Sequence, residues 1–371
     1  MNENIVRVGV VGVGGMGGNH ARSLSDGKIR GAVLGAVCDA NALQLETFTG
    51  VPSFTDFSTM LDSGAIDAVV IATPHYFHTV QGIESLSRGI PTLTEKPIAV
   101  HKADAERMIS AWEKCQPVFA AMFDQRTLPV YKKLREMLHD GTLGAVGRVT
   151  WIVTDWFRSQ AYYDSGSWRA TWGGEGGGIL VNQCPHNLDM FQWLFGMPES
   201  VTALARIGKY HNIEVEDEFH ALFDLPNCAT GAIIATTGEA PGTNRLEIAT
   251  ESGRILVEDD KLIWNKSEVP VSHFSRTTTE HMKAPDISNI EIPVVGSSRR
   301  HNEILANFVD AILDGTPLIA PAAEGLNSVE LANAILFSSF ERRTIDLPLN
   351  SADYEAFLQE KIAGSKFRFG G

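Results

Sequence analysis

The chain has 371 residues, of which 44% are hydrophobic, and its formal net charge at pH 7 is -14. This length predicts two domains, each with its own core. Nucleic acids and anionic membranes bind positively charged surfaces, so the acidic charge and the lack of a dense Lys/Arg cluster in the sequence argue against both partners and favour a small molecule.

The cysteines do not predict a disulfide framework. They are far apart and show no CxxC spacing: Cys38, Cys115, Cys184 and Cys228. This pattern favours reduced thiols in the cytoplasm and gives no support for a zinc site. The sequence starts without a basic leader, and no apolar run nears the ~20 residues of a membrane span. We therefore expect a cytoplasmic protein.

The first 123 residues alternate between short apolar runs and longer segments of helical period. The apolar runs, which we expect to be strands, are 5–11, 33–38, 67–72, 90–94 and 118–123. Between them, segments such as 101–115 place their apolar residues on one helix face. Continuous apolar strands separated by helices predict a parallel sheet covered on both sides, which is a doubly wound α/β domain.

A glycine-rich turn directly follows the first strand. Gly12, Gly14 and Gly17 complete the pattern GxGxxG, and a helix is expected to begin there. Without side chains, the backbone N–H groups can approach a pyrophosphate at the positive end of that helix. The alternative is a purely structural turn, but the strand before the motif and the helix after it favour a dinucleotide site.

Asp39, at the end of the second strand, indicates which dinucleotide is bound. Its carboxylate would accept hydrogen bonds from ribose hydroxyls and repel the 2′-phosphate of NADP. No Lys or Arg occurs between Arg30 and Arg88 to attract that phosphate. NAD is therefore favoured over NADP. Two alternatives stay open: a basic residue distant in sequence could fold onto the site, and Asp39 could merely form a turn.

Lys96 lies at the end of an expected strand, on the edge of the sheet where ligands bind. Parallel strands all end at one edge, so the glycine turn, residues 73–78 and residues 95–97 are expected to meet there. This places the Lys96 amine near the nicotinamide. The alternative is a solvated lysine in a loop, which is the commoner fate of lysines.

From about residue 124 the pattern changes to strands joined by short turns. The expected strands are 146–157, 200–208, 217–225, 228–237, 245–250 and 254–259. This succession predicts an antiparallel sheet. Two helices are expected near the end of the chain, at 301–313 and 323–341, and the polar stretch 265–298 is expected to be a long irregular loop.

Four segments resemble the family of glucose-fructose oxidoreductase, inositol dehydrogenase and MocA. They are the GxGxxG turn, TPHYFH (73–78), EKP (95–97) and GGGILVNQCPHNLD (176–189). The resemblance implies a Rossmann domain over residues 1–123 and an α+β domain over residues 124–371, whose large open, mostly antiparallel sheet forms a homodimer or homotetramer. It also implies NAD(P)-dependent oxidation or reduction of sugars or cyclitols.

By the same resemblance, Lys96 takes the catalytic position beside the nicotinamide and the substrate hydroxyl. Glu95 supports the cofactor ribose, and Pro97 orients the pair through a peptide bond that is often cis. A partly desolvated ammonium near a cationic nicotinamide should titrate below its reference pKa of ~10.4, in a range useful for proton exchange.

The expected cofactor site combines the glycine turn with the two loops at the sheet edge. Its residues are Gly12, Gly14, Gly15, Met16, Gly17, Asp39, Thr73, Pro74, His75, His78, Glu95 and Lys96. For the two histidines, the alternative is a loop side chain that faces water.

Asn182 departs from the family pattern, which places Asp-x-x-x-His at the start of a helix. His186 matches the histidine, but Asn182 stands at the aspartate position. An amide cannot relay a proton or stabilise an imidazolium as a carboxylate does, which leaves Lys96 and His186 as the titratable pair. We expect one of them to exchange the hydroxyl proton while the other holds the oxygen, with Asn182 orienting a second hydroxyl. A capping role for both residues is the alternative, and a metal pair of His186 with Asp189 is a poorer one.

Aromatic residues are dense just before this motif. Four of the seven tryptophans lie within 22 residues, and a sugar ring can stack on such flat faces. A buried sheet face or a subunit interface is an equal alternative, so only Trp168 and Arg169, which precede the segment GGEGGG, are added to the substrate site.

These residues predict an NAD-dependent oxidoreductase that transfers a hydride between nicotinamide and a hydroxyl or carbonyl carbon of a sugar, cyclitol or sugar derivative. The first alternative is an NAD-dependent enzyme that cleaves glycosides by transient oxidation and elimination. The second is a cofactor-binding regulatory protein without catalysis.

Overall fold

The computed structural model describes residues 5–367. Within this range, six parallel strands form the first sheet, in the order β3-β2-β1-β4-β5-β6. They are β1 (Val6–Val11), β2 (Ala32–Cys38), β3 (Ser53–Phe54), β4 (Ala68–Ile71), β5 (Thr92–Thr94) and β6 (Phe119–Ala121). The predicted doubly wound sheet is confirmed. Its strand order reverses between β1 and β4, and ligands bind at such a switch point.

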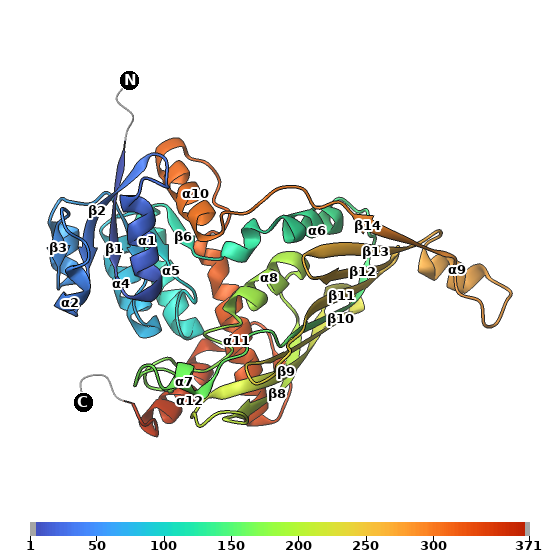
Figure 1. The fold of residues 1–371 in the computed structure, drawn as a ribbon. Helices are drawn as coiled ribbons and strands as arrows, with labels where there is room; N and C mark the ends of the chain where they lie inside the picture. The colour runs from blue at the N-terminus through green and yellow to red at the C-terminus, as the bar shows by residue number, and fades with distance from the viewer. Residues whose placement is uncertain (1–4, 368–371) are drawn as a thin grey trace.

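Helices lie on both sides of this sheet because its strands are apolar on both faces (Figure 1). They are α1 (Gly15–Ser25), α2 (Ala42–Leu45), α3 (Phe57–Asp62), α4 (His75–Ser87) and α5 (Lys102–Cys115). A later helix, α10 (His301–Asp314), joins them, since its residues Leu305, Phe308 and Val309 are buried in the same core. The C-terminal half of the chain therefore contributes to the first core.

The second sheet has nine strands among the described residues, in the order β14-β13-β12-β11-β7-β10-β9-β8-β15. They are β7 (Val146–Val153), β8 (Ser200–Ile207), β9 (Glu216–Leu225), β10 (Ala229–Thr236), β11 (Asn244–Thr250), β12 (Gly253–Glu258), β13 (Lys261–Ser267), β14 (Ile287–Ile292) and β15 (Ile345–Asp346). Neighbouring strands are antiparallel except for β7 and β10, which are parallel. The predicted mostly antiparallel sheet is confirmed.

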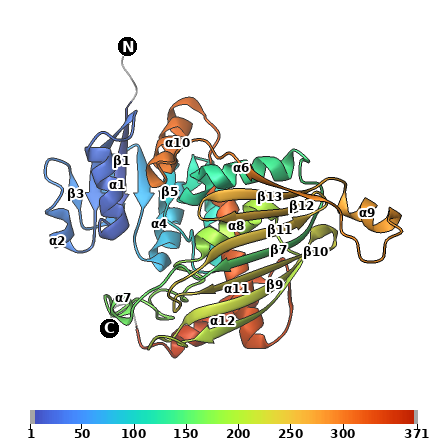
Figure 2. The ribbon, with the colours of Figure 1, turned by 45° about the vertical axis from the view of Figure 1, so that its right-hand side comes forward.

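Helices pack against one face of the second sheet, and in Figure 2 the strands lie in front of them. The second layer contains α6 (Pro129–His139), α8 (Pro185–Phe195), α11 (Gly325–Glu341) and α12 (Ser351–Ala363). Side chains alternate between the two faces, so Trp151 and Phe219 are buried under helices, whereas Leu204 and Leu222 are 57% and 64% exposed on the opposite face.

The stretch 265–298 is not the irregular loop that its polar composition predicts. It holds the end of β13, a short helix α9 (Val271–Thr277) and the edge strand β14. Five of the six β14 residues are exposed, so this strand lacks the apolar alternation by which a half-buried strand is recognised. Helix α9 projects from the far end of the sheet (Figures 1 and 2).

None of the helices in the described part of the chain is long and apolar enough to cross a membrane. All four cysteines lie in that part, and each is a free thiol.

Candidate active site

The glycine turn sits at the switch point of the first sheet, next to the loop after β4. Gly12 adopts φ +80°, and a Cβ atom there would lie 2.6 Å from the carbonyl oxygen of Ala72. At Gly17 a Cβ would lie 1.9 Å from the Gly12 oxygen, so both positions require glycine. A Cβ at Gly14 or Gly15 would meet no described atom within 4 Å, which leaves space in front of the turn.

The residues around this space fit a dinucleotide. Among the described residues, no side chain caps the N-terminus of α1 and no acidic residue stands in its first turn, so its N–H groups can receive an anion. The exposed Met16 lies in the same turn. Asp39 accepts hydrogen bonds from the backbone N–H of Val13 and of Asn41, each at 2.9 Å, and thereby holds a half-buried carboxylate beside the glycines. That position suits a ribose hydroxyl.

Lys96 lies beyond β5, and its Nζ donates a hydrogen bond to the backbone oxygen of Asn182 at 2.6 Å. The peptide bond between Lys96 and Pro97 is cis. Burial lowers the pKa of Lys96, and the neighbouring carboxylates Glu95, Glu175 and Asp124 act in the opposite direction.

Glu95 points away from solvent and pairs with a histidine on α1. Its Oε1 lies 2.7 Å from Nε2 of His20, and both side chains are buried. Burial by itself raises the pKa of Glu95, but the hydrogen bond with His20 and the charge of Lys96 bring it down to about 2. Glu95 is therefore an anion that is fixed between α1 and Lys96.

His186 stands in the first turn of α8, after Pro185, and is 8% exposed. Its Nδ1 lies 3.4 Å from Oδ1 of Asp124, which begins a 3-10 turn (Asp124–Thr127) directly after β6. Burial and the nearby Lys96 lower the pKa of His186 to about 3. Lys96 and His186, which come from different halves of the chain, therefore act on each other electrostatically.

Asn182, four residues before His186, lies beside the carboxylate of Glu175. Its side-chain amide donates to Oε1 of Glu175, and it lies 3.4 Å from the hydroxyl of Tyr162. Glu175 is 1% exposed and accepts a second hydrogen bond from the N–H of Ala170 at 2.7 Å. Burial raises the pKa of Glu175. Glu175 lies within the segment GGEGGG, and sequence analysis did not identify it.

Trp168 and Arg169, both half-buried, stand at this end of the site. Arg169 donates to the Tyr162 hydroxyl at 2.9 Å, and its guanidinium lies 4.6 Å from the Tyr162 ring and 4.7 Å from the Trp168 ring. In contrast, Trp151 and Trp172 are buried in the second core.

His75 and His78 lie in the first turns of α4, just after β4, and do not face water. His78 is 1% exposed, and its ring nitrogens lie 2.8 Å from the carbonyl oxygens of Thr73 and Pro97, so it joins two loops of the site. His75 is buried, 3.4 Å from the carbonyl oxygen of Glu175. Pro74 precedes α4 as its N-cap.

Asp189, which the sequence offered with His186 as a possible metal pair, forms an ion pair with Arg126. Two nitrogens of Arg126 contact its carboxylate at 2.6 and 2.8 Å. Among residues 5–367, no group of three or more His, Cys, Asp or Glu side chains could hold a metal ion.

Two family models match the chain. Residues 6–123 match an oxidoreductase family with an NAD-binding Rossmann fold, and residues 131–256 match the GFO/IDH/MocA C-terminal domain.

Curated relatives include the rhizopine catabolism protein MocA of Rhizobium meliloti, which is 30% identical over 193 residues. That match covers 51% of this chain and 57% of MocA, so the chain spans about half the length of this relative. An inositol 2-dehydrogenase of Rhizobium meliloti strain 1021 is 28% identical, and the match covers 92% of this chain and 99% of that protein. A similar solved structure is the WlbA dehydrogenase of Bordetella pertussis in complex with NADH and UDP-GlcNAcA, with a TM-score of 0.78 and 28% identity over 93% of this chain and 100% of that chain.

Proposed function

The chain belongs to the GFO/IDH/MocA family of oxidoreductases, and from this membership and the site geometry we propose that it is an NAD-dependent dehydrogenase or reductase of a sugar, cyclitol or sugar derivative. The observation that carries the proposal is the convergence of Lys96 and His186, from two halves of the chain, beside a glycine turn that fits a dinucleotide. Of the similar proteins named above, one is an inositol 2-dehydrogenase and another was solved in complex with NADH and UDP-GlcNAcA.

The residues of the first domain would hold the cofactor. The N–H groups of the glycine turn suit the pyrophosphate, Asp39 suits a ribose of NAD, and the anionic Glu95 stands beside Lys96. When bound, NAD supplies the carbon that accepts or returns the hydride.

His186 and Lys96 would divide the handling of the substrate hydroxyl. With its pKa lowered to about 3, His186 is neutral near pH 7, and a proton on Nδ1 facing Asp124 leaves Nε2 free to accept the hydroxyl proton. The Lys96 ammonium gives one hydrogen bond to the Asn182 oxygen and has further donors for the substrate oxygen. We assign His186 as the proton acceptor, because Asp124 raises its pKa against the effect of burial, and Lys96 as the group that holds the oxygen.

Asn182 would orient a second hydroxyl of the substrate. Its amide nitrogen is engaged by Glu175, which fixes the side-chain orientation and leaves the amide oxygen to accept from a substrate hydroxyl. The carboxylate that the family places at position 182 is thus replaced by two residues: Glu175 beside the amide and Asp124 beside His186.

We also propose that the exposed face of the second sheet joins two copies of the chain. Leu204 on β8 and Leu222 on β9 are large apolar side chains on that face, and Ile207 is 41% exposed near them. Burying such a patch stabilises a subunit contact. Leu222→Glu should then dissociate the oligomer in size-exclusion chromatography with light scattering, while an unchanged mass would contradict the proposed face.

The function is tested by following NAD reduction, and NADH oxidation in reverse, over a panel of aldoses, inositols, their acids and simple glycosides, with the product structures determined. Net NADH with an oxidised product supports a dehydrogenase. Cleavage of a glycoside without net NADH would replace it by the eliminating mechanism. Bound NAD with no hydride exchange on any member of the panel would contradict both.

A further inference from the structure

We propose that Arg158 and Arg169 bind an anionic group of the substrate, either a carboxylate or a phosphate. The proposal rests on the proposed function, because it names the class of sugar or cyclitol that the same site accepts.

Both arginines lie against the ring of one tyrosine, Tyr162. The guanidinium of Arg158 lies 5.1 Å from the centre of the Tyr162 ring, and that of Arg169 lies 4.6 Å from it. Trp156 and Trp168 extend these stacks, at 5.6 Å from Arg158 and 4.7 Å from Arg169. Stacking on aromatic faces orients a guanidinium and leaves its edge N–H groups available to an anion.

Neither arginine forms an ion pair with a carboxylate of the described residues, although the chain has 45 Asp and Glu against 31 Lys and Arg. Several other arginines are paired with carboxylates: Arg107 with Glu355, Arg126 with Asp189 and Arg300 with Asp124. The Nε atom of Arg169 is moreover buried and has no hydrogen-bond partner in the structure of residues 5–367. The charge of Arg169 also acts on the nearby Glu175, but no ion pair forms between them. A buried guanidinium N–H without a partner, next to a second arginine without an ion pair, indicates a place for an external anion.

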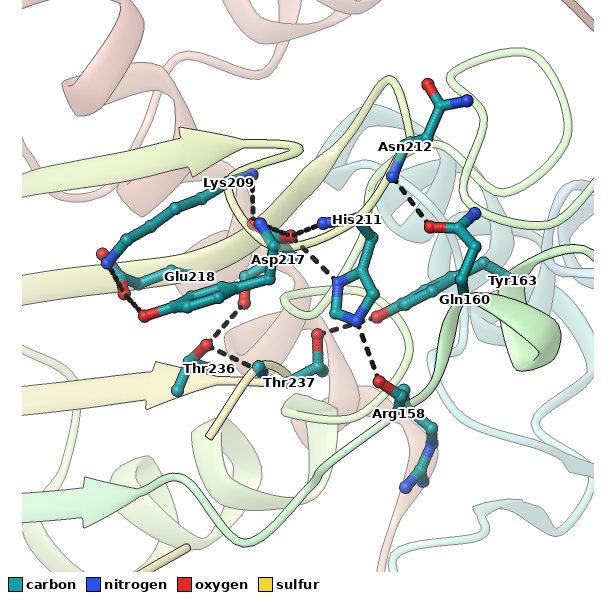
Figure 3. Close-up of polar contacts among 12 residues, drawn as sticks. Arg158, Gln160, Tyr163, Lys209, His211, Asn212, Asp217, Glu218, Thr236 and Thr237 are labelled. Atoms are coloured by element: carbon teal, nitrogen blue, oxygen red, sulfur yellow. Dashed lines mark hydrogen bonds and ion pairs between the residues drawn. The ribbon is translucent and has the colours of Figure 1, made fainter. Parts of the chain in front are cut away.

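The backbone of Arg158 is fixed on both sides, and Figure 3 shows its contact with His211. Its N–H donates to the carbonyl oxygen of Thr237 at 2.9 Å, and its carbonyl oxygen lies 2.8 Å from Nε2 of His211. The other ring nitrogen of His211 lies 3.0 Å from the fully buried carboxylate of Asp217. In Figure 3 the Arg158 side chain extends away from this network, which anchors the main chain. One guanidinium nitrogen, Nη1, donates to the Phe157 carbonyl oxygen at 2.9 Å, and the other N–H groups remain to contact a ligand.

The arginine pair is continuous with the proposed reaction centre. Lys96 donates a hydrogen bond to the backbone of Asn182, the side chain of Asn182 lies 3.4 Å from the Tyr162 hydroxyl, and the Tyr162 ring contacts both arginines. Arg158 is also close enough to Lys96 to act on its charge. A sugar held by Lys96 at one carbon would therefore present a carboxylate or phosphate on a more distant carbon to Arg158 and Arg169, and planar guanidinium groups bind both anions in a bidentate manner.

The test compares matched probes that differ in one group: a neutral hexose with its uronic acid and its 6-phosphate, and inositol with inositol monophosphate. Binding to the enzyme with NADH is measured by calorimetry, which needs no turnover and so separates this proposal from the proposed activity. We expect an anionic member of at least one pair to bind ten- to a hundredfold more tightly than its neutral counterpart. Preference for the acid or for the phosphate identifies the anion, and equal or weaker binding of every anionic member overturns the proposal.

Arg158→Gln and Arg169→Gln should each lower the ratio of anionic to neutral affinity about tenfold, and Arg169→Lys should retain part of it. Arg135→Gln is the matched control, because Arg135 also stacks on an aromatic ring, that of Trp193 at 4.3 Å, but lies on α6 away from the site. An unchanged ratio in both glutamine variants, or an equal loss in the Arg135 control, would overturn the assignment to these two residues.

Discussion

Oδ1 of Asp124 and Nδ1 of His186 face each other at 3.4 Å, and neither atom has a hydrogen-bond partner among the described residues. The other carboxylate oxygen of Asp124 is held by Nε of Arg300 at 2.7 Å. A closer and better aligned approach of the two buried groups would complete a hydrogen bond. The carboxylate is thus placed to stabilise the imidazolium that forms when His186 accepts a proton, which Asn182 cannot do.

Asp124→Asn should lower kcat about 10²-fold, because the amide keeps the shape but does not stabilise a positive imidazolium. KM should change little, and the solvent deuterium isotope effect on kcat should rise as proton transfer becomes limiting. Asp140→Asn, at the exposed end of α6, is the control. A purely structural role for Asp124 would instead lower the melting temperature and leave the isotope effect unchanged.

Lys96→Ala should reduce turnover by at least about 10³-fold, since the substrate oxygen loses its charged donor. NAD binding, measured by fluorescence titration, should weaken less than about fivefold, because the glycine turn and Asp39 are untouched. Lys133→Ala removes a lysine whose partner is Glu136 on the same helix and serves as the control. Normal turnover of the true substrate by the Lys96 variant would refute the proposed mechanism.

The lowered pKa of Lys96 also predicts how kcat/KM falls at alkaline pH. Burial lowers its pKa below the ordinary 10.5, so the ammonium is lost at a lower pH than for a solvated lysine. If the ammonium holds the substrate oxygen, kcat/KM should fall as pH rises through this lowered value. A limb at or above pH 10.5, or a profile that rises with pH as for a neutral amine base, would contradict that role.

Much of the fold could be predicted because its signals are local. The apolar run of β1, the apolar run of β4 and the glycine turn are each short segments that can be recognised without the rest of the chain. The positive φ of Gly12 is what the glycine motif requires. Strand β14 and helix α9 could not be recognised, because both are almost wholly exposed. Pairing with β13 positions β14, and hydrogen bonds from Val271 and Ser272 to Glu251 position α9.

Some residues of the candidate site could likewise be predicted from local sequence signals, and others could not. Lys96 follows a strand at the edge where ligands bind, and Asp124 follows β6 at the same edge, so the rule that identified the lysine could also have found the aspartate. Glu175 and Tyr162 had no such signal, because their contacts with Asn182 depend on how loops of the second half fold. The partners of His78, two backbone carbonyls, are equally invisible in a sequence.

Asp39→Asn should weaken the preference for NAD over NADP. The amide oxygen can still accept one of the two hydrogen bonds, from Val13 or from Asn41, but the charge that repels a 2′-phosphate is gone. We expect the ratio of kcat/KM for NAD to that for NADP to fall about tenfold. A wild-type enzyme that uses both cofactors equally would disprove the role of this carboxylate.

Glu216 offers a stability prediction, because it holds the segment that leads to Asn182. Its Oε1 accepts hydrogen bonds from the N–H groups of Gly178 and Leu180 at 2.9 and 3.0 Å, while Oε2 is buried and has no partner within the described chain. Burial raises the pKa of Glu216 from 4.5 to about 7. The folded state therefore binds the proton more tightly than the unfolded state.

Stability from such a group is fully present below pH 4.5 and is lost as pH rises through about 7. Between pH 5 and pH 8 the loss from Glu216 amounts to about 2 to 3 kcal/mol. In Glu216→Gln, the amide oxygen accepts from the same two N–H groups but does not titrate. Urea titrations should therefore show that, between pH 5 and pH 8, the free energy of unfolding of this variant rises relative to that of the wild type by about 2 to 3 kcal/mol. Glu113→Gln, at an exposed position on α5, should run parallel to wild type. A constant difference between Glu216→Gln and wild type at all pH values would mean that Glu216 stays ionised in the folded protein.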